Sequence, residues 1–184
     1  MLRIIAGDYK GMSLSCPGGR QVRPTSDRAR GSLFNILTHR FSLPDGRNIL
    51  QNAHVLDAFA GTGALGLEAL SRGARKADFF EKDLSVLPIL HSNLACAGEK
   101  AQIFDQDIMK VPQTEQAANV AFFDPPYAMK GLEKILDILS LRGWIDSHTL
   151  CILEYDKKCS SPEGATIVHY SSASRNQFCY FHWK

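Results

Sequence analysis

The stretch "HVLDAFAGTGALGLEALSRG", residues 54–73, decides the fold of this chain. Its first six residues are mostly apolar and run into a glycine-containing loop, which predicts a short buried strand. Its last eleven residues carry apolar side chains at helical spacing and end at Gly73, which predicts a helix. The loop between them contains Gly61, Gly63 and Gly66, which satisfy the pattern G-x-G-x-x-G. Glycines in such a loop let the backbone turn tightly and let a ligand approach it closely.

The same alternation continues on the C-terminal side of this stretch. Helices are predicted at residues 84–98 and 131–143, and strands at residues 76–82, 101–107, 119–124, 149–155, 165–171 and 176–183. Strands that alternate with helices predict a mostly parallel sheet with helices on both faces. The last two strands have no helix between them, so we expect an antiparallel hairpin at one edge. The predicted fold is therefore α/β and Rossmann-like, with a mostly parallel seven-stranded sheet.

The first 47 residues follow a different pattern. Two short strands, "LRIIAG" and "MSLSC", flank the turn "DYKG". The segment "TSDRARGSLFNILTHRF" predicts a helix that Thr25 or Ser26 caps, with an apolar stripe ending at Phe41. The polar linker "LPDGRN" follows it. These features predict a small hairpin-and-helix appendage at residues 1–47, and a main domain at residues 48–184.

The composition is that of a soluble globular protein. The chain has 184 residues, of which 45% are hydrophobic and 22% charged. It lacks an apolar run of the roughly 20 residues that a membrane helix needs, and its beginning does not resemble a signal peptide, so we expect a cytoplasmic protein. The five cysteines form no close CxxC pair and the six histidines are scattered, which predicts reduced thiols and no metal site.

Charge is unevenly distributed along the chain. Residues 1–47 hold eight basic and three acidic residues, whereas residues 48–184 hold thirteen basic and sixteen acidic ones. A basic N-terminal part suits a phosphate backbone. It suits an ordinary solvated surface equally well, so charge alone does not decide between the two readings.

Two acids bear on what the glycine loop binds. Glu81 follows the second strand of the main domain, where a carboxylate can accept hydrogen bonds from ribose hydroxyls. This fits a dinucleotide-binding dehydrogenase and an S-adenosylmethionine (SAM) enzyme equally. Asp57 favours SAM, because a carboxylate beside the loop would repel a pyrophosphate but attract the ammonium of SAM. After the third strand, Asp107 or Asp105 is expected to accept from the adenine amino group, with Ile108 against the ring.

The segment "NVAFFDPPY", residues 119–127, ends an apolar strand on a carboxylate, two prolines and an aromatic ring. Ligands of open parallel sheets bind at the carboxyl ends of the strands, so Asp124 should face the same crevice as Gly61. Proline has no N–H and a fixed φ. The segment therefore predicts a rigid set of acceptors, which suits the exocyclic amine of a nucleobase, with Tyr127 stacking on the base.

The glycine loop together with "DPPY" resembles amino-methyltransferases that act on nucleic-acid bases. "RPTSDRARGSLFNIL" followed by "VLDAFAGTGALGLEALSRGA" resembles more specifically the RsmD family, over nearly the whole chain. This family methylates the 2-amino group of a guanine in small-subunit (16S) ribosomal RNA. Two places depart from the family's pattern: Gly31 replaces a glutamate, and the tail "SRNQFCYF" lacks the usual Tyr-Gly pair.

The resemblance implies three groups of site residues and a substrate. The cofactor, SAM, would be bound by Asp57, Phe59, Ala60, Gly61, Thr62, Gly63, Glu81, Lys82, Asp107 and Ile108. The target guanine would be held by the catalytic residues Asp124, Pro125, Pro126 and Tyr127. The substrate RNA would be contacted by Arg23 and Thr25, which with Pro24 close over the site, and by Arg28 and Arg30. The expected partner is 16S rRNA or the assembling small ribosomal subunit, bound by a monomer that needs neither metal nor membrane.

Other functions use some of the same motifs. DNA adenine or cytosine amino-methyltransferases share both, but they usually carry a separate segment that reads the target sequence. Only 57 residues follow Tyr127 (184 − 127), and completing the sheet uses most of them. A base presented by folded RNA needs less recognition machinery. A protein glutamine methyltransferase, a dehydrogenase and a non-catalytic RNA-binding module are the remaining alternatives.

Overall fold

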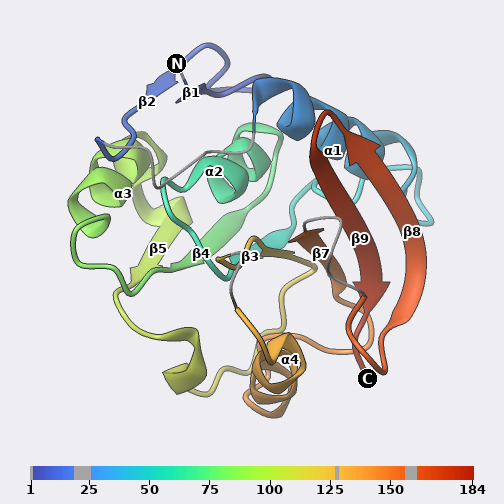
Figure 1. Ribbon diagram of the computed structural model, residues 1–184. Helices are drawn as coiled ribbons and strands as arrows, with labels where there is room; N and C mark the ends of the chain where they lie inside the picture. Colours follow the sequence, from blue (N-terminus) through green and yellow to red (C-terminus); the bar gives the residue numbers. More distant parts are fainter. Residues whose placement is uncertain (1, 19–25, 127–128, 156–160) are drawn as a thin grey trace.

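A computed structural model describes residues 2–18, 26–126, 129–155 and 161–184. Its main sheet has seven strands in the order β5-β4-β3-β6-β7-β9-β8 (Figure 1). Neighbouring strands from β5 to β7 are parallel, whereas β9 is antiparallel to β7 and β8. The predicted α/β fold with its antiparallel edge hairpin is therefore confirmed. The strands are β3 (His54–Asp57), β4 (Lys76–Phe80), β5 (Ala101–Phe104), β6 (Val120–Phe123), β7 (Leu150–Tyr155), β8 (Thr166–Ala173) and β9 (Asn176–His182).

Helices cover both faces of the sheet. In Figure 1, α1, α2 and α3 lie above it and α4 lies below it. The helix predicted at residues 84–98 is α3 followed by a 3₁₀ segment, η1, and Pro88 lies in its first turn, where proline is tolerated. The helical elements are α1 (Asp27–His39), α2 (Ala64–Ser71), α3 (Leu87–Leu94), η1 (Ala95–Lys100), η2 (Ile108–Lys110) and α4 (Leu132–Leu141).

The core consists of two apolar clusters, one on each face of the sheet. Successive residues of one strand point to opposite faces, so Phe122 joins the cluster under α1 and α2, whereas Phe123 joins the cluster over α4. Likewise, Phe79 joins the cluster under α1 and α2, and Phe80 joins the cluster over α4. Burial on both faces explains why the central strands are nearly continuous apolar runs.

The N-terminal hairpin of β1 (Leu2–Arg3) and β2 (Ser13–Leu14) packs into the same cluster as Phe122. A carboxylate on α2 attaches it there. Glu68 is fully buried and accepts the backbone N–H groups of Ile5 and Ala6 at 2.7 and 3.1 Å. The guanidinium of Arg72 pairs with the same carboxylate at 2.8 Å. A buried charge that is paired and hydrogen-bonded in this way holds the hairpin to the main sheet.

Helix α1 begins at a serine cap, since the Ser26 Oγ accepts the N–H of Ala29 at 3.2 Å. Arg30 is fully buried on the inner face of α1. Its guanidinium donates to the carbonyl of Arg3 at 2.5 Å and to the carboxylate of Asp27 at 3.0 Å. The prediction that Arg30 faces RNA is therefore wrong. It lies one turn before Leu33 on the apolar face, and it ties α1 to the hairpin.

Of the strands in the described part of the chain, β9 alone pairs with the edge strand β8, and a register shift between Ile167 and His169 interrupts this pairing. Its N-terminal and C-terminal halves therefore bend relative to each other. Residues alternate between partly buried and exposed along it, as expected when one face of a strand packs against α1. None of the helices in the described parts of the chain has the length and hydropathy needed to cross a bilayer.

Candidate active site

The carboxyl ends of β3, β4, β6 and β7 meet at one edge of the sheet, and the glycine loop lies there. Gly61 and Gly63 both have a left-handed backbone, with φ of 53° and 78°. A Cβ on Gly66 would lie 2.3 Å from the ring of Phe79, so α2 can approach β4 only with glycine at this position. Among the described residues, a Cβ on Gly61 would meet nothing within 4 Å, so these residues leave the space beside it open to a ligand.

Asp57 ends β3 beneath this loop and is buried. Its Oδ2 accepts the N–H of Gly66 at 2.9 Å. Burial raises the pKa of the Asp57 carboxyl to about 7, an effect that the Gly66 hydrogen bond opposes and the charge of Glu81 increases. A cationic ligand beside Asp57 would favour the ionised form, whereas an anionic pyrophosphate would oppose it. The site therefore suits an ammonium group.

Glu81 follows β4 and faces the glycine loop. Its Oε2 accepts the N–H of Gly61 at 2.9 Å, and its Oε1 accepts the N–H groups of Lys82 and Asp83 at 2.9 and 2.8 Å. Three backbone donors thus fix the carboxylate beside the open space at Gly61. Because a carboxylate has about four lone-pair sites, Glu81 can still accept from a ligand hydroxyl.

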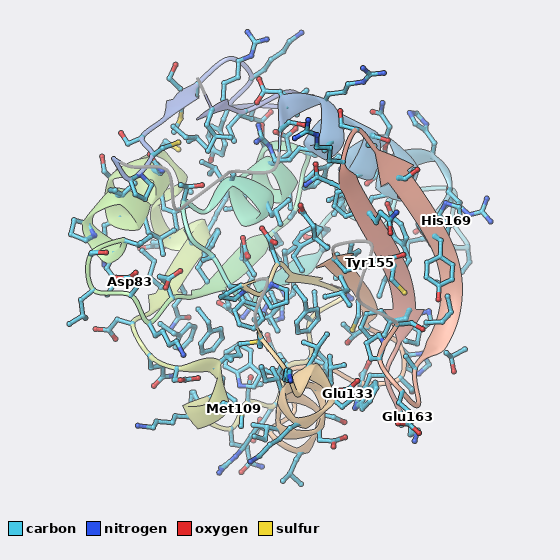
Figure 2. All side chains as sticks on the ribbon, in the orientation of Figure 1. Asp83, Met109, Glu133, Tyr155, Glu163 and His169 are labelled. Atoms are coloured by element: carbon cyan, nitrogen blue, oxygen red, sulfur yellow. The ribbon has the colours of Figure 1, made fainter. Side chains whose placement is uncertain are left out.

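Asp107, rather than Asp105, is held at the site by neighbouring groups. Its Oδ1 accepts the N–H of Met109 at 3.0 Å, and its Oδ2 pairs with Lys82 Nζ at 3.0 Å. The Met109 hydrogen bond is the main reason why the pKa of Asp107 lies below its usual value, and Lys82 adds to it. Asp105 is exposed. Figure 2 shows Met109 on the side of the sheet that α4 covers.

The other predicted cofactor residues lie in or beside the loop. The N–H of Ala60 donates to the carbonyl of Phe80 at 2.9 Å, and Phe59 and Ile108 belong to the cluster over α4. Thr62 is buried, and its carbonyl accepts Asn93 Nδ2 at 2.9 Å.

Asn93 is a positioning residue that sequence reasoning missed. Besides Thr62, its amide contacts both the carbonyl and the N–H of Ser15, at 3.0 and 2.8 Å. Asn93 is therefore bonded to the glycine loop and to the hairpin at once. The signal in the sequence was an amide at helical spacing from the apolar residues Val86, Leu90 and Ala97.

A second acid lies next to Asp124 in the sheet. The parallel register pairs Phe123 of β6 with Leu153 of β7, so the next residues, Asp124 and Glu154, follow side by side on strands about 4.8 Å apart. Glu154 is buried, and its Oε1 accepts from the Asn176 side chain. The sequence contained a signal for Glu154, because it is a carboxylate inside the apolar run "TLCILEY", but it was not predicted as a site residue.

Burial, and then the negative charges of Glu154 and Asp57, together raise the pKa of the Asp124 carboxyl to about 8. Asp57 pairs with Phe122 across β3 and β6, and Asp124 lies two residues beyond Phe122, hence on the same face. Asp57, Asp124 and Glu154 thus form a row of three carboxylates, which we call the acid row, across the carboxyl ends of three adjacent strands. Pairs of titratable groups whose environments perturb each other are frequent at active sites.

The remaining predicted residues are only partly described. Pro125 is partly buried, and the carbonyl of Pro126 accepts the N–H of Met129 at 2.8 Å. Arg28 is exposed on α1. Three of the predicted site residues, Arg23, Thr25 and Tyr127, lie outside the described residues, as does Pro24. Within the described ranges, no group of three or more histidine, cysteine or acidic side chains is placed to hold a metal ion.

Comparison with known proteins agrees with this geometry. Residues 2–183 match the family described as "Conserved hypothetical protein 95", and ribosomal RNA small subunit methyltransferase D of Haemophilus influenzae is 35% identical over 175 residues, covering 91% of this chain and 86% of the relative. The chain belongs to the RsmD family. The same enzyme of Escherichia coli is 36% identical over 163 residues, covering 88% of this chain and 78% of the relative.

A solved structure from Escherichia coli, yhhF, described as a candidate methyltransferase, has the same fold as this RsmD family member. It superimposes with a TM-score of 0.81 at 32% identity, covering 100% of this chain and 98% of the other. The agreement extends over the N-terminal hairpin and α1 as well as the main sheet, so the full Rossmann-like methyltransferase fold is common to both.

Proposed function

We propose that this protein methylates the exocyclic 2-amino group of a guanine in small-subunit ribosomal RNA, with SAM as the methyl donor. The names of its RsmD relatives support a small-subunit rRNA substrate and methyl transfer. The observation that carries the choice of guanine is the pair of adjacent carboxylates, Asp124 and Glu154, at the ends of β6 and β7.

The residues at the glycine loop fit SAM. Asp57 would hold the ammonium, Glu81 the ribose hydroxyls and Asp107 the adenine amino group, while the open space beside Gly61 admits the ligand. When bound, SAM supplies a methyl group on a sulfonium, which is already a good leaving group. The cation would also stabilise the ionised form of the acid row, because an opposite charge lowers the pKa of a carboxyl group.

Guanine is the base whose donors match two neighbouring acceptors. Its 2-amino group lies next to N1–H, so its edge presents two adjacent donors. In adenine and in cytosine the amino group lies next to a ring nitrogen that is an acceptor. A second carboxylate beside Asp124 would therefore attract guanine and repel the other two bases. We infer that Asp124 accepts from the 2-amino group and Glu154 from N1–H.

Asp124 also activates the amine in this proposal. The lone pair of an exocyclic amine is delocalised into the ring, so the nitrogen is a poor nucleophile. An ionised Asp124 that accepts an N–H bond draws the nitrogen toward tetrahedral geometry and localises the lone pair. Pro125 and Pro126 restrict the backbone at the same point, so positioning and electrostatics carry the catalysis.

Methyl transfer to three substrates tests the proposal: small subunits from cells that lack the enzyme, naked small-subunit rRNA, and duplex DNA. Labelled methyl should appear on the guanine 2-amino group of rRNA, identified by mass spectrometry of the nucleosides. Comparing the particle with the naked RNA would show which of them presents the base. Methyl on DNA adenine or cytosine would contradict the proposal and favour the DNA alternative.

Glu154→Gln tests the pairing with guanine separately. A glutamine keeps the shape but loses the charge, and a hydrogen bond to a charged group contributes about 1.5–3 kcal/mol. We therefore expect kcat/KM to fall by roughly 10- to 100-fold. Asp137→Asn, on the exposed face of α4, is a matched control that should transfer methyl at the normal rate. Equal rates for Glu154→Gln and the control would remove Glu154 from guanine recognition.

A further inference from the structure

An open groove runs between the outer face of α1 and the edge strand β8. It has a volume of about 830 Å³. Its α1 residues follow one another at helical spacing, so they form a single stripe along the helix. Figure 2 shows His169 on β8, on the right of the view. The groove is lined by Arg28, Gly31, Ser32, Asn35, Ile36, His39, Arg40 and His169.

The described residues that line the groove include two arginines and no carboxylate. Both Arg28 and Arg40 are exposed. Three other arginines, Arg3, Arg47 and Arg72, each pair with an acid at 3.1 Å or less. Among the described residues, no such ion pair is found for Arg28 or Arg40. An anionic partner would satisfy them.

The remaining groups in the groove suit hydrogen bonding to phosphate oxygens. Ser32 and Asn35 supply a hydroxyl and an amide, and Ile36 is the single large apolar side chain in the lining. Burial, and then the charge of Arg40, lower the pKa of His169, so its imidazole is neutral at physiological pH and can still donate one hydrogen bond. A lining of this kind favours a polyanion over an apolar peptide.

The groove has the length and position to hold a strand that leads to the active site. From Arg28 to His39 the helix rises about 17 Å, at 1.5 Å per residue, which is enough for several consecutive nucleotides. The opposite face of α1 packs on β6, and Asp124 directly follows this strand. The rings of Phe34 and Phe122 lie 5.6 Å apart, and Phe122 is two residues before Asp124.

We propose that this groove binds the phosphate backbone of the RNA that flanks the target guanine. This inference rests on the proposed function, and it adds His39, Arg40 and His169 to the RNA-facing residues. The groove would give affinity and register, whereas the acid row reads the base, a division that is general in nucleic-acid recognition.

Gly31 leaves one position in the lining of the groove without a side chain. A Cβ on Gly31 would meet only the Ile5 side chain, at 3.9 Å, so the structure has room for a larger residue. A glutamate here would place a carboxylate one turn from Arg28 and from Asn35, inside the groove. The glycine therefore leaves the groove more positive than a glutamate at this position would.

The test is the affinity of fluorescently labelled small-subunit rRNA fragments for the protein across a series of salt concentrations. In the double variant Arg28→Ala/Arg40→Ala, the slope of log K against log [salt] should fall by about 1.4 to 1.8, because each lost phosphate contact removes about 0.7 to 0.9. Gly31→Glu should weaken binding by roughly 3- to 10-fold. Arg47→Ala, an exposed arginine outside the groove, is the matched control and should bind RNA normally.

Three outcomes separate the groove from the proposed function. If the wild type methylates the guanine but the double variant keeps the full salt slope, the groove proposal is wrong and the function stands. If the wild type methylates no RNA while the salt slope falls as expected, the proposed function is wrong; the groove then binds RNA phosphates, but not beside a target guanine. If the double variant binds naked RNA normally and loses affinity only for the assembled small subunit, the groove proposal is wrong, and the groove contacts an acidic protein of the subunit instead. SAM binding by every variant, measured by calorimetry, verifies that the fold is intact.

Discussion

The free energy of unfolding of the ligand-free protein should fall as the pH becomes alkaline. Replacing Asp124 by asparagine should abolish much of this fall. The folded pKa of Asp124 is about 8, above the value of about 3.9 for an unfolded chain. A carboxyl whose pKa is raised on folding stabilises the protein fully below the unfolded value, and that contribution disappears as the pH rises through the folded value. Between about pH 6 and about pH 9, this one group should therefore reduce the free energy of unfolding by roughly 2–3 kcal/mol.

Urea unfolding of the wild type and of Asp124→Asn, at about pH 6 and about pH 9, measures the difference. Between these two pH values, the free energy of unfolding should fall by roughly 2–3 kcal/mol more in the wild type than in the variant. Asp57, with its pKa of about 7, contributes a smaller loss to both proteins. Asp137→Asn is the matched control and should keep the wild-type dependence on pH. Parallel losses in the wild type and in Asp124→Asn would show that Asp124 is already ionised in the free protein, and would refute the reasoning from the acid row.

Two further substitutions test the site and its scaffold. Asp124→Ala should abolish methyl transfer but leave SAM binding measurable by calorimetry, because the proposed cofactor residues lie at the end of β3, in the glycine loop, and directly after β4 and β5. Unchanged turnover would contradict the proposed role of Asp124 as acceptor. Gly66→Ala should lower the free energy of unfolding by roughly 1–3 kcal/mol, because the added Cβ would lie 2.3 Å from the Phe79 ring. Urea unfolding measures this difference. If the variant is as stable as the wild type, α2 can move away from β4 without cost.

The fold was predictable from the sequence because its signals are local. The apolar runs of the central strands, the helices between them and the glycine loop each occupy a short segment, and their alternation determines the parallel order. The meeting of Asp57 and Asp124 was also predictable in outline, since the carboxyl ends of parallel strands share one edge of the sheet.

The missed features depend on contacts between distant segments. The proximity of Glu154 to Asp124 follows from the register of β6 and β7, which no short motif encodes. Asn93 contacts Thr62 and Ser15, 31 and 78 residues away. Arg30 is different, because its spacing from Leu33 and Leu37 already placed it on the apolar face of α1. It was predicted to face RNA because of the resemblance, which outweighed the helical pattern.

The buried Glu68 on α2 affects the order in which the chain folds during synthesis. Chains emerge from the ribosome with the N-terminus first, and N-terminal parts generally fold first. Here the backbone N–H groups of Ile5 and Ala6 bond to a carboxylate 62 or 63 residues later. The first strand therefore cannot reach its final place until α2 has been made. The N-terminal hairpin is synthesised first, but it can dock only after α2 has formed. In chains that stall before Glu68, the hairpin would therefore be exposed to proteases.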